Sequence, residues 1–436
     1  MIGQVCEIEL RSNEVYRNPF TNIRMLSTIT SPSGVRMQIG GFFDGDNTWK
    51  FRFSPNEPGT WKYQTTVIPV DEDLIEEGSI YIEPTDQQHR GFLRTTKELP
   101  WGFVFDSGDP CFLVGDTQYN LIGAAHCGVD VERILRHRRQ QGYNIVRARV
   151  PVSPFCPKNA YNVWQNRSTW PWAGSPQIPI LDRFNLAYFR SMDHVLQLIS
   201  RLGMGVELIL EGWGIEFPFN QRSVFNDQLE ELWIRYVVSR YDAFDSIYMW
   251  DIMNEYIYYP HGKYISGDTT CDEWAGRMAR LIKQAGPHGH PIAVHTMEEP
   301  EPTYAERLSA YPEIDVLLFQ SWGVTDAENA WLAAGIDKSI EKNTTGALQV
   351  CILAEYGYEH TQEYEFTFFG FRNLTAEHTR RGAYRAVFSG LPVFAGFDNT
   401  WGPFMQIDPD PPGASQVGYL SNLFQHILPF YRLRPT

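Results

Sequence analysis

Short apolar runs alternate with stretches of helical amphipathic period along most of the chain, from Cys111 to the carboxyl end. Eight of these runs have the length of a buried strand. They are CFLVGDT (111–117), YNIVRARV (143–150), GVELILEGWG (205–214), IYMWDIMNE (247–255), PIAVHT (291–296), IDVLLFQSWG (314–323), LQVCILAEYGYE (348–359) and PVFAGFDNTWG (392–402). Eight strands, each followed by a helix, are typical of a (β/α)8 barrel, so we predict a TIM barrel. The alternative is a doubly wound sheet, but no run is followed by the GxGxxG or GxxxxGK(S/T) motif of a nucleotide site.

The first 90 residues show a different pattern, in which short alternating runs are separated by turns. These runs are VCEIEL, VRMQIGGFFDG, TWKFRFSP and GTWKYQTTV. Strands at this spacing predict a small antiparallel β-sandwich. Because 436 residues exceed the size of a typical single domain, we predict a β-sandwich domain at 1–90 and the barrel at 91–436.

Two carboxylates stand where predicted barrel strands leave the core. The fourth run ends in Asn254 and Glu255, and the seventh ends near Glu355. The carboxyl ends of barrel strands form the active-site face, and the fourth and seventh strands lie opposite each other, so the two glutamates can flank one small group. Such a pair suits glycoside hydrolysis, in which one carboxyl protonates the leaving oxygen and the other attacks the anomeric carbon. Asp251, deeper in the fourth run, is expected to be structural, whereas Glu359, after the seventh, is the alternative nucleophile.

Composition narrows the kind of partner. The formal net charge of −15 argues against nucleic acid or an anionic membrane surface, and no apolar run is long enough to span a bilayer. Aromatic residues make up 14%, and many lie in loops with Gly and Pro, which suits the apolar faces of sugar rings, although packing explains a large share of them. The six cysteines lack CxxC or CxxH spacing, so neither a zinc site nor a disulfide scaffold is indicated. No other metal cluster emerges, and we expect no cofactor.

The amino end, MIGQVCEIELRSNEVYRN, lacks the basic start and apolar centre of a secretory signal. The compartment is therefore left open between the cytoplasm and export followed by removal of a signal. A homo-oligomer is left open as well.

Several stretches resemble known families. An Asn-Glu pair at the end of the fourth strand and a Glu at the end of the seventh resemble glycoside hydrolase clan A, and Asn254, Glu255 and Glu355 match these positions. The stretches CFLVGDTQYN, QQGYNIVRARV, DIMNEY and AEYGYE resemble the apiosidase-like barrels of that clan. The stretch GFFDGDNTWKFRFSPNEPGTWKYQTT resembles a β-sandwich family that precedes many glycosidase barrels.

The clan resemblance implies that Glu255 is the acid/base and Glu355 the nucleophile of a retaining mechanism. The acid then needs a raised pKa while the nucleophile stays ionised. Arg147 and Arg149 alternate onto one face of the second strand, and we expect Arg149, nearer the carboxyl end, to hold Glu355 in its charged form. Asn254 is expected to donate to a sugar hydroxyl, most usefully the 2-OH.

Further residues at strand ends are candidates for substrate binding: Asp116, Glu211, Trp213, His295, Gln320, Trp322 and Trp401. Asp116 is matched in the resembling barrels and is expected to bind a hydroxyl of a terminal sugar. Glu211 is left open between sugar contact and support of the site, and the three tryptophans between stacking on a sugar and loop packing. His295 is expected to be hydrogen-bonded within the site. The sandwich segment 42–49 either reaches the site or only stabilises the molecule.

We therefore predict a retaining glycoside hydrolase that cleaves a plant or microbial polysaccharide, or its oligosaccharides, by double displacement with two glutamates. A transglycosylase shares the covalent intermediate and is the alternative within enzymes. A carbohydrate-binding protein that has lost catalysis is the alternative outside them.

Overall fold

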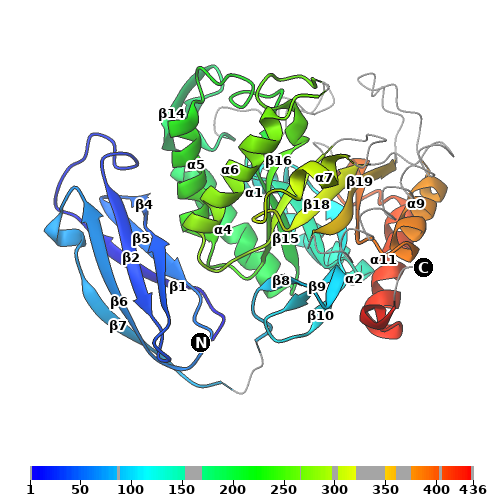
Figure 1. The fold of residues 1–436 in the computed structure, drawn as a ribbon, viewed down its shortest axis with the longest axis horizontal. Coiled ribbons are helices and arrows are strands. Elements are labelled where there is room, and N and C mark those ends of the chain that lie inside the picture. The colour runs from blue at the N-terminus through cyan, green and yellow to red at the C-terminus, as the bar shows by residue number, and fades with distance from the viewer. Residues whose placement is uncertain are drawn as a thin grey trace.

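The computed structural model of the chain describes residues 2–85, 89–152, 169–265, 267–296, 303–320, 349–359, 375–401 and 405–433. Within these ranges a β-sandwich of the amino-terminal residues lies beside a barrel surrounded by helices (Figure 1).

Eight parallel strands close into a barrel, which confirms the predicted fold. In order around the barrel they are β11 (Val114–Thr117), β12 (Ile145–Arg149), β15 (Gly205–Trp213), β16 (Ile247–Asn254), β17 (Ile292–His295), β18 (Val316–Gln320), β19 (Val350–Glu359) and β20 (Val393–Phe397). Each strand falls within one of the eight apolar runs, and β20 pairs with β11 to close the ring.

Helices on the outside cover the barrel. They are α1 (Leu121–His126), α2 (Val131–Gln141), α4 (Leu186–Arg201), α5 (Asp227–Tyr241), α6 (Thr270–Ala285), α7 (Thr303–Leu308), α9 (Ala376–Phe388), α10 (Asp398–Trp401) and α11 (Pro412–Asn422). Local sequence sets their ends: the Asn226 side chain accepts from the first free amides of α5, and Gly142 ends α2 at a φ of +109°. The hairpin β13 (Trp172–Ser175) and β14 (Ile178–Phe184) precedes α4.

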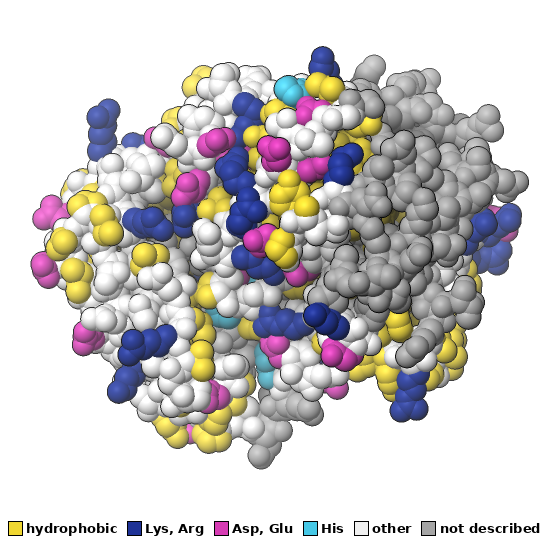
Figure 2. Space-filling model, in the orientation of Figure 1, with side chains coloured by type: hydrophobic (Ala, Val, Ile, Leu, Met, Phe, Trp, Pro, Cys, Tyr) yellow, Lys and Arg dark blue, Asp and Glu magenta, His cyan; other side chains and the backbone are white. Residues whose placement is uncertain are grey.

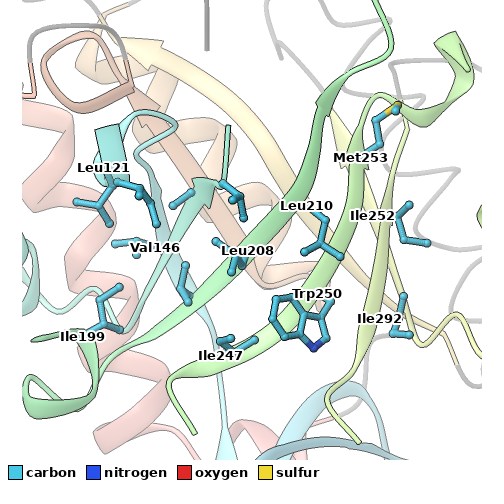
Figure 3. Packing of buried hydrophobic residues seen from close by; sticks show 14 of the residues in the cluster. Leu121, Val146, Ile199, Leu208, Leu210, Ile247, Trp250, Ile252, Met253 and Ile292 are labelled. Carbon is cyan, nitrogen blue, oxygen red and sulfur yellow. The ribbon is translucent and has the colours of Figure 1, made fainter. Parts of the chain in front are cut away.

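Apolar side chains from alternate strand positions pack between the barrel and its helices. Figure 3 shows Leu208 and Leu210 along β15 beside Trp250 and Ile252 of β16, all of them buried. Full burial of one such side chain stabilises the fold by ~1.5–3 kcal/mol. The intervening positions of these strands point into the barrel, so residues such as Glu207 and Asp251 lie inside it.

A small antiparallel sheet closes the amino-terminal end of the barrel. It consists of β8 (Leu93–Thr96), β9 (Leu99–Phe105) and β10 (Pro110–Cys111) and was not among the predicted elements. Leu93, Phe103 and Phe105 form one buried cluster with inward-facing barrel residues such as Met249. The carboxyl ends of the strands are therefore the end at which a site can form.

The amino-terminal residues form two antiparallel sheets, which confirms the predicted sandwich. One sheet contains β1 (Cys6–Arg11), β5 (Thr48–Phe53) and β4 (Phe42–Gly45). The other contains β3 (Arg36–Gly40), β2 (Arg24–Thr30), β6 (Gly59–Ile68) and β7 (Glu77–Ile82), of which β2 and β7 were not predicted. Trp49, Phe51 and Trp61 fill the space between the sheets. A domain boundary near residue 90 stays a prediction.

The sandwich contacts the side of the barrel, against α4 and α5. Phe42 packs on Tyr236 with ring centroids 6.4 Å apart, and Asp44 lies 2.9 Å from the Arg240 guanidinium. A cavity of about 860 Å³ lies along this junction, between the sandwich and α5. Of the two interpretations of segment 42–49, the structure favours the stabilising one, because these contacts are made with helices and not with the strand ends.

The acidic excess is not gathered in one patch on the face shown in Figure 2, where Lys and Arg side chains form a band through the middle with Asp and Glu beside them. Among the described residues, no helix combines the length and apolar character needed to cross a membrane.

Candidate active site

The two predicted catalytic glutamates lie at the carboxyl ends of opposite strands. Glu255 follows β16 directly, and Glu355 pairs in register with Gln320, the last residue of β18. Each side chain is largely buried, with about 6% of each residue exposed. Glu255 has a φ of +52°, a strained conformation for a residue other than glycine, and such strain occurs mainly at functional sites.

Arg147, on β12, is the fully buried centre of the site. Its Nη1 donates to Glu355 Oε2 at 3.2 Å and to the Tyr119 hydroxyl, and its Nη2 donates to Asn254 Oδ1 at 2.8 Å. Its Nε donates to Glu207 at 2.9 Å. The charge-assisted bond from the guanidinium fixes the orientation of the Glu355 carboxyl.

Tyr119 supports Glu355 from a second direction. Its hydroxyl accepts from Arg147 and donates to Glu355 Oε2 at 2.7 Å. Both donors meet the same carboxylate oxygen, Oε2. Tyr358, at a φ of +50°, also lies near Glu355, and its buried hydroxyl interacts with that carboxyl.

Glu255 lies in surroundings that favour its neutral form. Burial, followed by the negative charge of Glu355, raises the pKa of Glu255 to about 8. Arg147, Gln320 and Trp213 oppose this rise without cancelling it. Glu255 is therefore protonated at neutral pH, as a general acid must be.

His295 joins the two glutamates. Its Nδ1 accepts from the Glu255 backbone amide at 3.1 Å, which fixes the strained residue in place and puts the ring proton on Nε2. The Nε2 atom lies 3.7 Å from Glu355 Oε2. Burial, with a smaller effect of Arg147, lowers the pKa of His295 well below its usual range, so the ring is neutral.

Asn254 is oriented by the same guanidinium. Because its Oδ1 accepts from Arg147, its Nδ2 is the group that can donate to a substrate hydroxyl.

Aromatic side chains border the glutamates. The Trp401 ring meets Tyr358 edge-on at 4.7 Å and lies 6.2 Å from Tyr119, both of which contact Glu355. Trp213 lies against the Glu255 carboxyl and meets Tyr258 at 5.6 Å. Both tryptophans therefore lie at the site, whereas Trp322 falls outside the described residues.

The prediction that Arg149 holds Glu355 is wrong, because Arg147 makes that contact. Arg149 pairs with Glu216, at 3.1 Å between Nη1 and Oε1, in the loop after β15. Both arginines face inward, but Arg149 lies two residues nearer the mouth and its guanidinium turns over Gly212 towards that loop. Arg147 lies two residues deeper in the same strand, and its long side chain reaches Glu355 from there.

The prediction that Asp116 binds a sugar is also wrong. The residue is fully buried, and its oxygens accept from Arg138 at 2.7 Å, Gln118 at 2.9 Å and Thr400 at 3.0 Å. Asp116 therefore anchors α2 and α10 to the barrel.

Glu211 does not contact a sugar either, because it is fully buried. The charges acting on it are those of Glu230 in α5, Arg222 in the loop before α5 and Arg277 in α6. Burial, followed by the charge of Glu230, raises the pKa of Glu211 well above the usual range. Glu359, the alternative nucleophile, accepts from the Gly413 amide at 3.2 Å and so points towards α11.

Sequence reasoning missed the roles of Tyr119, Tyr358 and Glu207. Tyr119 follows the first strand in GDTQYN. Because aromatic residues at other strand ends are candidates for the site, its place in the sequence could have indicated a role for it. Nothing in the sequence marked Glu207 or Tyr358.

A closed parallel barrel with two buried glutamates at its strand ends, one of them held by an arginine, is typical of glycoside hydrolases. The chain belongs to the apiosidase-like family, since residues 102–431 match the family described as "Apiosidase-like, catalytic domain". Residues 4–67 match a domain of unknown function, DUF5060.

Solved structures show the same fold. A protein from Bacteroides vulgatus ATCC 8482, provisionally described as a glycoside hydrolase, has 18% identity and a TM-score of 0.72, over 97% of this chain and 77% of that one. A family 5 glycoside hydrolase from the same organism has 17% identity and a TM-score of 0.54, over 77% and 71% of the two chains. A family 5 mannosidase from Rhizomucor miehei has 14% identity and a TM-score of 0.54, over 77% and 98%. No curated protein matches the chain.

Proposed function

We propose that this protein is a retaining glycoside hydrolase in which Glu355 is the nucleophile and Glu255 the acid/base. The observation that carries the proposal is the difference between the two carboxyls. Arg147 and Tyr119 donate to Glu355, whereas burial and the charge of Glu355 keep Glu255 protonated. A protonated carboxyl beside a second carboxyl that is held by cationic and hydroxyl donors is what acid-assisted displacement needs.

In the first step, Glu355 Oε1 forms a bond to the anomeric carbon while the bond from that carbon to the leaving oxygen breaks. Glu255 gives its proton to that oxygen, so the leaving group departs as a neutral alcohol. Asn254 Nδ2 donates to the 2-OH of the sugar, a contact that strengthens in the transition state.

In the second step, Glu255, now a carboxylate, takes a proton from water while the water oxygen attacks the anomeric carbon and releases Glu355. Esterification of Glu355 removes the negative charge that raised the pKa of Glu255. The pKa of Glu255 then falls, so its carboxylate form persists and can act as the base.

The substrate is a plant or microbial polysaccharide or an oligosaccharide derived from it. Trp401, Tyr358 and Trp213 offer ring faces and edges around the reacting carboxyls, and such groups suit the apolar faces of sugars.

The test is a screen of the intact protein on plant and bacterial glycans, with Glu255→Gln and Glu355→Gln beside the wild type. We expect each variant to lose at least about 10³-fold in kcat/KM on the responsive substrate with its natural leaving group. Glu359→Gln is the matched control, because Gln still accepts from Gly413 and the residue belongs to the same strand. Near-normal rates in both active-site variants would contradict the proposal.

A further inference from the structure

Two carboxyl side chains lie beneath the active site, inside the barrel. Glu207 comes from β15 and Asp251 from the neighbouring β16, and both are fully buried. Glu207 Oε1 accepts from Arg147 Nε at 2.9 Å, so Glu207 binds the same guanidinium that contacts Glu355.

The remaining oxygens of the pair lack donors in the described part of the chain. Neither Glu207 Oε2 nor either oxygen of Asp251 has a hydrogen-bond donor there. Arg147 Nη2 comes no closer than 3.6 Å to Asp251 Oδ2, because that nitrogen is committed to Asn254. The two carboxyls do interact with each other directly. Two ionised carboxylates can only accept hydrogen bonds, so a contact between them needs a proton.

The balance of charge around Arg147 also indicates that one of these carboxyls carries a proton. Arg147 is one cation facing three carboxyls, those of Glu207, Asp251 and Glu355. Burial, and then the charge of Glu207, raise the pKa of Asp251 well above its usual range, with Arg147 opposing. Burial also raises the pKa of Glu207, but Arg147 and the contact with Asp251 oppose that rise, whereas the same contact raises the pKa of Asp251 further. The proton therefore belongs to Asp251.

We propose that Asp251 is a permanently protonated positioning residue, which donates its O–H to Glu207 and so keeps the Arg147 guanidinium directed at Glu355. Glu207, fixed by this bond, holds Nε of Arg147, and the opposite edge of the guanidinium is left for Glu355, Tyr119 and Asn254. An ionised Asp251 would instead draw Nη2 away from Asn254 and share the charge that Glu355 needs. The catalytic part of this inference rests on the proposed role of Glu355.

The first experiment compares Asp251→Asn with Asp251→Ala in the full chain. Asn keeps a donor towards Glu207 and is neutral like the acid it replaces, so we expect kcat within about threefold of wild type and an unmoved acidic limb of the pH profile. Ala removes the donor, and the resulting shift of Arg147 is expected to lower kcat by about 10- to 100-fold with little change in KM. Equal losses in the two variants, or an acidic limb displaced to lower pH in Asp251→Asn, would overturn the proposal.

The second experiment needs no activity and therefore separates this inference from the proposed function. Infrared difference spectra of wild type and Asp251→Asn at neutral pH, in H2O and D2O, report which form of the carboxyl the substitution removes. We expect the loss of a carbonyl band of a protonated carboxylic acid. The exposed Asp227→Asn is the control and should lose only carboxylate bands. A carboxylate loss in Asp251→Asn would show that Asp251 is ionised and the inference wrong.

Discussion

At the scale of single residues, one guanidinium distinguishes the surroundings of two chemically identical side chains. Arg147 contacts Glu355 directly, whereas Glu255 is affected mainly by burial and by the charge of Glu355. Such a difference in surroundings, and not in residue type, is what the proposed division into acid and nucleophile requires.

The first prediction concerns the basic limb of the pH profile. Because Glu255 must carry a proton in the first step and its pKa is raised to about 8, kcat/KM should fall as the pH rises through about 8. In Glu355→Gln the neighbouring charge is gone, so the pKa of Glu255 should fall. Carbon NMR titration of labelled glutamate measures this without turnover, and an unchanged Glu255 titration would contradict the assignment.

The second prediction compares two arginines of one strand. Arg147→Lys removes the planar fork that serves four partners, so kcat/KM should fall by about 10²–10³-fold. Arg149→Lys should cost less, because Arg149 pairs with Glu216 and not with the nucleophile. Steady-state kinetics with circular dichroism as a folding control would decide this. A larger loss in Arg149→Lys would mean that the wrong arginine has been identified.

At the scale of elements, the barrel strands were predictable because each is a nearly continuous apolar run, as expected of strands buried on both faces. Because the strands are parallel, Glu255 and Glu355 were expected at the same end of the barrel, and the strand order placed them across its mouth. The choice between Arg147 and Arg149 was not predictable, since it depends on how far a long side chain reaches and not on which face it occupies. The surroundings of Glu211 were not predictable either, because the charges near it come from helices and a loop distant in the sequence.

The third prediction concerns α4 and α5, the helices that contact the sandwich. Asp193 of α4 binds two buried guanidiniums, Arg240 at 2.6 Å and Arg52 at 3.1 Å. Asp193→Ala leaves both without this partner and should lower the free energy of unfolding by ~3–5 kcal/mol. Asp227→Ala, which breaks an exposed pair with Arg222, is the control and should cost less than ~1 kcal/mol. Denaturant unfolding measures both, and equal effects would contradict this account of the interface.

At the scale of the whole molecule, the sandwich and the reacting groups are separate. The sandwich contacts α4 and α5 on the side of the barrel, while the glutamates lie at the strand ends. Stability and catalysis should therefore respond to different substitutions.

The fourth prediction tests this separation. Phe42 is buried at the junction, with the guanidiniums of Arg240 and Arg52 4.8 and 5.0 Å from its ring. Phe42→Ala should lower the free energy of unfolding by ~3–5 kcal/mol and leave kcat/KM of the folded protein unchanged. Glu255→Gln should show the opposite pattern. A large loss of kcat/KM in folded Phe42→Ala would mean that the sandwich takes part in the reaction.

The central claim, that Glu355 attacks and Glu255 assists, is tested most directly by the configuration of the first product. A proton NMR time course on the responsive substrate resolves the anomer released before mutarotation. Double displacement through a Glu355 ester predicts that the first-formed sugar has the same anomeric configuration as the bond that was cleaved. A first product of inverted configuration would contradict the claim, because it would require water, and not Glu355, to attack the anomeric carbon.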